Sequence, residues 1–312
     1  MDASNPAVEA RNLVKLFGDT RAVDGVSLSV PAGTIYGILG PNGAGKTTCL
    51  RMLLGIIDPS SGERTLLGRE RPLEAAHEVG YLPEERGLYP AMTCVEAIAF
   101  MGALRGLPLR EGRKRGLELL DGHGLGDWAK KPIRTLSKGM AQTVQLLGTI
   151  VHLPRLIVLD EPFSGLDAIN QEKLEAMIRR QAEDGVTVLF STHVIAHAER
   201  LCERIAIIAK GKVAFDGEVR EARDRLRPIV RLQTRAEDGP WRSAIPADAR
   251  REGAEYVFEL PKEGPEALLK SLIDGGAGIE TLAIERPGLH DAFVAIAGAA
   301  AAEAMGDVER GE

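Results

Sequence analysis

The stretch Gly40-Pro-Asn-Gly-Ala-Gly-Lys46-Thr47-Thr48 fits the phosphate-loop pattern G-x-x-x-x-G-K-[ST]. An apolar run, Thr34–Leu39, precedes it and a helical pattern, Thr47–Leu54, follows, which is the context that this motif requires. Glycines let backbone N–H groups converge on phosphate oxygens, and a helix start adds positive potential. We therefore expect a phosphate site formed by Gly40, Pro41, Asn42, Gly43, Ala44, Gly45, Lys46, Thr47 and Thr48.

Two side chains of this loop have expected roles in binding a nucleotide. Lys46 is long enough to reach the β- and γ-phosphates. The hydroxyl of Thr47 is a ligand for Mg²⁺ in loops of this kind. The expected cofactors are therefore ATP and Mg²⁺.

A second motif, Leu156-Ile-Val-Leu-Asp160-Glu161-Pro162, places two adjacent carboxylates at the end of an apolar run. Successive strand residues point to opposite faces, so the two carboxylates are free to do different work. Asp160 is expected to hold Mg²⁺ through water, and Glu161 to act as the general base on the attacking water. Alone, this pattern fits a solvated acidic turn equally well; the phosphate loop upstream favours the catalytic interpretation.

Further apolar runs at Val79–Leu82 and Val186–Phe190 predict buried strands of a parallel sheet covered on both faces. Helical patterns lie between them, so the fold class predicted is α/β. The segment 89–150 reads as a helical insertion, with helices at Val95–Leu104, Arg113–Leu120 and Gln142–Ile150.

Beyond residue 217 the pattern changes. We predict a first domain over 7–217, a charged linker helix over 218–228, a small α+β domain over 229–302 and a tail over 303–312. The strands expected in the small domain are Ile229–Thr234, Glu255–Leu260 and Ile279–Ile284, and the helices are Pro265–Ile273 and Leu289–Ala297.

Composition limits the function classes. A net charge of -6 argues against a uniformly basic surface for nucleic acid, so no nucleic-acid partner is expected. Cys49, Cys94 and Cys202 match neither a disulfide framework nor a zinc site, which fits reduced thiols in a cytosol. The longest apolar stretch, Ala292–Ala302, falls short of the ~18 residues that span a bilayer. Any membrane role is therefore expected to act through a partner.

Four further features make the chain resemble an ATP-binding cassette (ABC) ATPase, which is a P-loop NTPase. Leu136-Ser137-Lys138-Gly139-Met140 resembles the signature motif, and Ser164-Gly165-Leu166-Asp167 resembles the D-loop. His193, after Phe190-Ser-Thr, matches the switch histidine, and Phe17 lies where the family stacks an aromatic ring on adenine. The resemblance covers about Val8 to Gly217.

The resemblance implies an ABC-type nucleotide-binding domain with a helical subdomain, working as a head-to-tail dimer with a second copy or a related ATPase subunit. Each ATP would meet Lys46 and Asp160 of one subunit and Ser137 and Gly139 of the other. His193 would contact the γ-phosphate, and Asp167 would cross the dimer interface. A separate transmembrane permease subunit is implied, with this chain on the cytoplasmic, inner face of the cell membrane.

Two departures from the family pattern point to a branch. Lys138 and Met140 replace Gly and Gln of the usual LSGGQ, and Glu84 stands at the Q-loop position, where a carboxylate is still a possible Mg²⁺ ligand. With Gly80–Pro90 and Pro287-Gly-Leu-His-Asp-Ala-Phe293, they resemble the sodium-exporter-like (NatA-like) branch of ABC-2 exporters. The cargo is not encoded in these motifs.

Two other functions fit the sequence less well. Soluble ABC ATPases that act on ribosomes usually carry two cassettes, and those that act on DNA carry a long coiled coil; this chain has neither pattern. A small-molecule kinase would share the phosphate loop and lack the signature, D-loop and switch histidine in this order. An ABC-2 exporter motor is therefore the favoured hypothesis.

Overall fold

The computed structural model describes residues 5–85 and 87–309, and the chain divides into two compact units. The first unit is Met1–Val219 with Ile296–Glu312, and the second is Arg220–Ala295. The domain boundaries expected from the sequence remain predictions.

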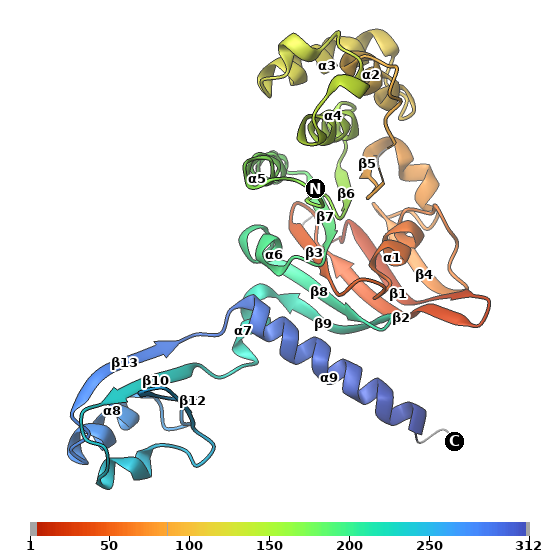
Figure 1. Ribbon diagram of the computed structural model, residues 1–312. Coiled ribbons are helices and arrows are strands. Elements are labelled where there is room, and N and C mark those ends of the chain that lie inside the picture. The colour runs from red at the N-terminus through yellow and green to blue at the C-terminus, as the bar shows by residue number, and fades with distance from the viewer. Residues whose placement is uncertain (1–4, 86, 310–312) are drawn as a thin grey trace. The chain divides into compact units, whose positions relative to one another are not determined.

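A six-stranded sheet of order β5-β6-β7-β3-β8-β9 forms the centre of the first unit (Figure 1). Its neighbouring strands are parallel except for β8 and β9. Every residue of β3, β6 and β7 is buried, as the continuous apolar runs predict. The strands are β3 (Ile35–Leu39), β5 (Val79–Leu82), β6 (Leu156–Asp160), β7 (Thr187–Thr192), β8 (Arg204–Ala209) and β9 (Lys212–Glu218). The α/β fold class and the four strands expected from apolar runs are confirmed; β8 and β9 were not predicted.

A second, antiparallel sheet of order β2-β1-β4 was also not predicted. It consists of β1 (Val8–Phe17), β2 (Thr20–Val30) and β4 (Ser61–Leu66). Helix α1 (Lys46–Leu53) packs between the two sheets, because its Leu50 and Met52 share one core with residues of β1, β2, β3, β6, β7 and β8. This packing on both sides holds the start of α1, and so the phosphate loop, in place.

The opposite face of the parallel sheet is covered by other helices. Leu146 of α4 (Lys138–Ile150) and Ile178 of α5 (Ala168–Glu183) meet Ile157 and Val188 of the sheet around a small apolar space. Helix α6 (Ile195–Leu201) follows β7 and buries Ala198 and Leu201. The sheet is therefore covered on both faces, as the sequence predicts.

The insertion between β5 and β6 is helical, as predicted, and forms a separate group within the first unit (Figure 1). It contains α2 (Cys94–Ala103), α3 (Leu109–Gly122), α4 and two short turns, η2 (Gly126–Trp128) and η3 (Ile133–Thr135). A further turn, η1 (Pro72–Glu78), precedes β5 and lies outside the insertion. Thr93 and Glu96 form a capping box at the start of α2. Helix α4 begins four residues before the predicted Gln142, because Ser137 caps it and the glycine at 139 does not stop it.

The second unit is a small α+β fold, as predicted. Strands β10 (Ile229–Thr234), β11 (Arg250–Glu252), β12 (Glu255–Glu259) and β13 (Ile279–Glu285) lie in the order β11-β12-β10-β13, all antiparallel. Turn η4 (Pro240–Ala244) follows β10 and helix α8 (Pro265–Asp274) follows β12. This is the βαββαβ order of a ferredoxin-like fold with a 3₁₀ turn in place of the first helix. Its core includes Trp241, Val230, Leu232, Phe258 and Leu272.

Two further helices flank this sheet in the sequence. Helix α7 (Val219–Asp224) lies in the predicted linker, and α9 runs over Leu289–Glu309. Residues 303–309 of the predicted tail therefore continue α9, and residues 310–312 lie outside the described residues. In the part of the chain that the structure describes, no helix combines the length and apolar character needed to cross a membrane.

Candidate nucleotide site

The phosphate loop is held by close backbone contacts. Gly45 has φ +101°, and a Cβ at this position would overlap the carbonyl oxygen of Ala22, so only glycine fits. Ala44 is buried, and its carbonyl accepts a hydrogen bond of 3.0 Å from the N–H of Gly211. The loop tip, residues 41–43, is exposed. A rigid base thus presents an exposed tip, which suits a loop that wraps phosphates.

Lys46 is folded back over this loop. Its Nζ donates to the carbonyl oxygens of Gly40 at 2.8 Å and Pro41 at 3.2 Å. It also lies 3.2 Å from Oε1 of Glu161, and the two side chains are only 6% and 8% exposed. Buried charges are stable only when paired, so this contact holds the loop and the end of β6 together.

The Asp160 carboxylate has one satisfied and one unsatisfied oxygen. Its Oδ1 accepts hydrogen bonds from Oγ1 of Thr47 at 3.0 Å and from Oγ of Ser191 at 2.6 Å. Its Oδ2 is buried and has no hydrogen-bond partner among the described residues. A buried carboxylate oxygen without a donor, next to a threonine hydroxyl, is the oxygen-rich environment that Mg²⁺ prefers. The residues present therefore fit the expected metal.

Glu161 lies between two candidate catalytic residues. Its Oε2 is 2.9 Å from Nδ1 of His193, and its Oε1 faces Lys46. Its backbone has φ +46°, an unfavourable conformation for a side chain of this size. The N–H of Glu161 donates to Oγ of Ser191 at 3.1 Å, which helps to hold this conformation. Strain of this kind is concentrated at functional sites.

The structure thus brings Lys46, Thr47, Asp160, Glu161 and His193 into one connected cluster, here called the Walker cluster. They come from the start of α1, the end of β6 and the residue after β7. Carboxyl ends of parallel strands meet at one edge of a sheet, which is where ligands bind in folds of this kind.

Two other predicted residues lie on the surface. Phe17, at the end of β1, is 52% exposed, and Nζ of Lys15 lies 5.2 Å from its ring centroid. Glu84, two residues after β5, is exposed. An open ring fits an adenine platform, whereas the Mg²⁺ role of Glu84 stays a prediction.

The remaining predicted residues begin other helices. Ser137 caps α4, accepting a hydrogen bond of 3.3 Å from the N–H of Met140, and Asp167 caps α5, accepting one of 2.9 Å from the N–H of Asn170. Both are exposed, and Gly139 is buried. No hydrogen bond described in the structure joins any of the three to the Walker cluster.

Ser191 is a site residue that sequence reasoning missed. Its hydroxyl donates to the carboxylate of Asp160 and accepts a hydrogen bond from the backbone N–H of Glu161. The sequence shows only a hydroxyl within the apolar run of β7. Its role becomes visible once β7 is known to pair with β6, which places Ser191 opposite Asp160.

His197, four residues after His193, belongs to a different cluster. Its ring stacks on Phe163, with centroids 3.9 Å apart, and its Nδ1 lies 2.8 Å from Oε1 of Glu175. Arg200 also binds Glu175, at 2.5 Å. The hydrogen bonds from Arg200 and His197 outweigh burial and lower the pKa of Glu175. The two histidines therefore face different carboxylates, and His197 ties α6 to α5.

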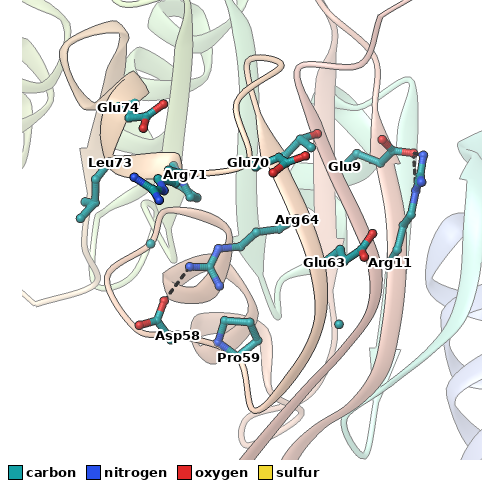
Figure 2. A pocket seen from close by; sticks show the side chains of 14 residues that line it. Glu9, Arg11, Asp58, Pro59, Glu63, Arg64, Glu70, Arg71, Leu73 and Glu74 are labelled. Carbon is teal, nitrogen blue, oxygen red and sulfur yellow. Dashed lines mark hydrogen bonds and ion pairs between the residues drawn. The ribbon is translucent and has the colours of Figure 1, made fainter.

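A hollow that contains none of these residues lies elsewhere in the first unit. It measures about 900 Å³ and lies along β4, β1 and η1 (Figure 2). Its charged residues include two ion pairs, Arg11 with Glu9 at 2.8 Å and Arg64 with Asp58 at 2.9 Å. None of the predicted site residues lines it. The volume of this hollow therefore does not mark it as the candidate nucleotide site.

Comparison with known proteins gives consistent matches. A model of the ABC transporter family matches residues 23–164. An uncharacterized ABC transporter ATP-binding protein of Bacillus subtilis, YhaQ, is 35% identical over 92% of this chain and 97% of its own length. The daunorubicin/doxorubicin resistance ATP-binding protein DrrA of Streptomyces peucetius is 33% identical over 94% of this chain and 92% of its own. Among solved structures, cbiO1 of Clostridium perfringens, part of the ABC transporter complex cbiONQ, is 26% identical with a TM-score of 0.61, covering 72% of this chain and 96% of its own.

Proposed function

The chain belongs to the ABC transporter ATP-binding family, and from this premise we propose that it is the ATP-driven motor of an ABC-2-type exporter. As a family member it binds and hydrolyses ATP. The proposed working form is a head-to-tail dimer, beside a separate permease subunit at the inner face of the cell membrane.

The observation that carries the dimer is the division of the candidate site into two groups. The Walker cluster is assembled within one chain, whereas Ser137 and Asp167 are exposed helix caps outside it. The start of α4 is capped by a neutral serine, and the positive end of a helix suits phosphate oxygens. A second copy bringing its Ser137 and Gly139 to the first copy's phosphates would complete the site.

The Walker cluster supports a direct role for each residue in phosphoryl transfer to water. Lys46 would leave the carbonyls of Gly40 and Pro41 for the β- and γ-phosphates, which frees Glu161. Glu161 would then accept a proton from the attacking water, while His193 holds the water and the γ-phosphate in line. Thr47 and Asp160 would hold Mg²⁺, which neutralises charge on the phosphates.

A groove in the first unit supports a docked membrane partner. It measures about 420 Å³ and is lined by α2, α4 and the segment after β5, including Tyr89, Phe100 and Leu104. Tyr89 and Leu104 are 57% and 68% exposed, and exposed apolar side chains around a groove mark interaction sites. The groove adjoins Pro83, next to Glu84, so a partner there would sense the nucleotide side of the unit.

The exporter branch rests on sequence and on the names of relatives. DrrA is named for drug resistance, which fits export. The residues Pro287–Phe293 of the NatA-like pattern form the start of α9, where Leu289 and Ala292 are fully buried and the N–H of Gly288 donates to Asp291. This motif thus has a defined structural use at the end of the second unit.

Mixing two inactive variants tests the dimer. Lys46→Ala should lose phosphate binding, and Ser137→Asp should keep the helix cap yet repel phosphate. Each alone should be nearly inactive. In a mixture about half of the dimers are mixed with one intact site each, so about a quarter of the parental ATPase activity should return. A mixture no more active than either variant would refute the head-to-tail arrangement.

Purification of the tagged chain from detergent-solubilised membranes of its host tests the exporter role. We expect a polytopic membrane protein in stoichiometric amount. Recovery with ribosomes or nucleic acid would favour the soluble ABC ATPase instead and leave the ATPase assignment intact.

A further inference from the structure

The signature motif and the D-loop contact each other within one chain. Gly139 is the second residue of α4, and a Cβ there would lie 2.5 Å from Nδ2 and 2.6 Å from Cγ of Asn170. The side chain of Asn170, in the first turn of α5, therefore fills the space that a larger residue at 139 would need. Alanine at 139 would displace it.

A second contact of this kind lies at Gly165 of the D-loop, where the side chain comes from α4. A Cβ at Gly165 would overlap the ammonium group of Lys138, the first residue of α4. Gly165 also has φ +67°, so a side chain there is disfavoured twice. Each motif thus contains a glycine, and the space beside it is occupied by a side chain from the other segment: Asn170 of α5 at Gly139, and Lys138 of α4 at Gly165. Lys138 is one of the two departures from the usual signature, and this contact gives it a structural use.

Asn170 is held in this position by the D-loop itself. Its Nδ2 donates to Oδ2 of Asp167 at 2.8 Å, and its backbone N–H donates to Oδ1 at 2.9 Å. These hydrogen bonds lower the pKa of Asp167. A third tie joins the segments, because Nε2 of Gln142 in α4 donates to the carbonyl of Pro162 at 3.1 Å.

We propose that Lys138 and Asn170 form a clamp that makes the signature motif and the D-loop one rigid unit. Both are positioning residues, since neither belongs to the Walker cluster. The catalytic consequence rests on the proposed dimer: the two segments that one subunit would present to its partner would arrive in a single fixed geometry. Engagement of phosphate by Ser137 would then place Asp167 at the same moment.

Hydrogen exchange of the full-length chain without nucleotide tests the clamp independently of any dimer. Asn170→Ala keeps the hydrogen bond from the backbone N–H of residue 170 to Asp167 and removes only the side chain that packs against Gly139. Amide exchange should rise about tenfold in residues 140–143 of α4 as well as in residues 164–170. Lys138→Ala should affect the same two segments. Lys173→Ala, an exposed change on α5, is the matched control and should affect neither. Faster exchange confined to the mutated segment would overturn the clamp.

Steady-state kinetics tests the consequence for catalysis. Asn170→Ala and Lys138→Ala should each lower kcat about tenfold with KM for ATP unchanged, because the Walker cluster is untouched. The double variant should lose less than the product of the two single losses, since both changes release the same pair of segments from each other. Altered exchange with a parental kcat would show that the clamp exists and overturn its role in turnover. If the mixing experiment refutes the dimer, the exchange result still decides the clamp.

Discussion

Two groups of candidate site residues differ in how the fold holds them. Lys46, Asp160 and Glu161 are 6%, 0% and 8% exposed and contact one another or a shared neighbour. Phe17 is 52% exposed, and Glu84 and Ser137 lie on the surface. The first group is positioned by the sheet edge and by the pairing that buried charges require. The second group lies at a strand end, in a loop and at a helix start, outside this network.

The difference indicates which catalytic residues are already positioned within one chain. Preorganised charge in a buried site acts without reorganisation, so the Walker cluster should set the rate of the chemical step. Exposed residues act on whatever docks against them, so they should set affinity for the nucleotide or the partner. Three substitutions test this division.

The largest effect is expected for Glu161→Gln in the buried group. Loss of the general base should lower ATP hydrolysis by about 10²–10⁴-fold, whereas ATP binding survives and an ATP-bound dimer accumulates. Phosphate release and size-exclusion chromatography with ATP measure the two results. Glu183→Gln, an exposed change at the end of α5, serves as the control. Hydrolysis at the parental rate would show that Glu161 is not the base.

A smaller effect, on binding alone, is expected for Phe17→Ala in the exposed group. Stacking of a base on an aromatic ring contributes about 1–3 kcal/mol, so the Kd for ATP should rise about 5- to 150-fold. At saturating ATP, kcat should stay at the parental value. Calorimetric titration measures the Kd, and Leu16→Ala at the neighbouring exposed position is the control. An unchanged Kd would remove Phe17 from the site.

The smallest effect is expected for Glu84→Gln. Removing an exposed negative charge near ATP should lower KM about two- to fivefold, and high salt should abolish the difference. ATPase titrations at low and high salt measure this, with Glu85→Gln as the adjacent control. A large fall in kcat instead would place Glu84 with the buried group, as a Mg²⁺ ligand.

Prediction from sequence worked best where one face or one motif decides the structure. The runs at Ile35–Leu39 and Leu156–Leu159 carry no charged residue, and only a strand buried on both faces suits them. Strands β1 and β2 were missed because they carry many polar residues and register shifts, so the alternation that marks a half-buried strand is broken. Their sheet is recognisable only from its packing on α1.

The α/β class, the phosphate loop and the order of the family motifs are predictable from the sequence, because they depend on local spacing and composition. Which residues contact one another follows from the packing of the chain. Ser191 reaches Asp160 because β7 lies beside β6, and Asn170 fills the space above Gly139 because α5 starts against α4. Contacts between segments distant in sequence arise from packing, and no local pattern records them.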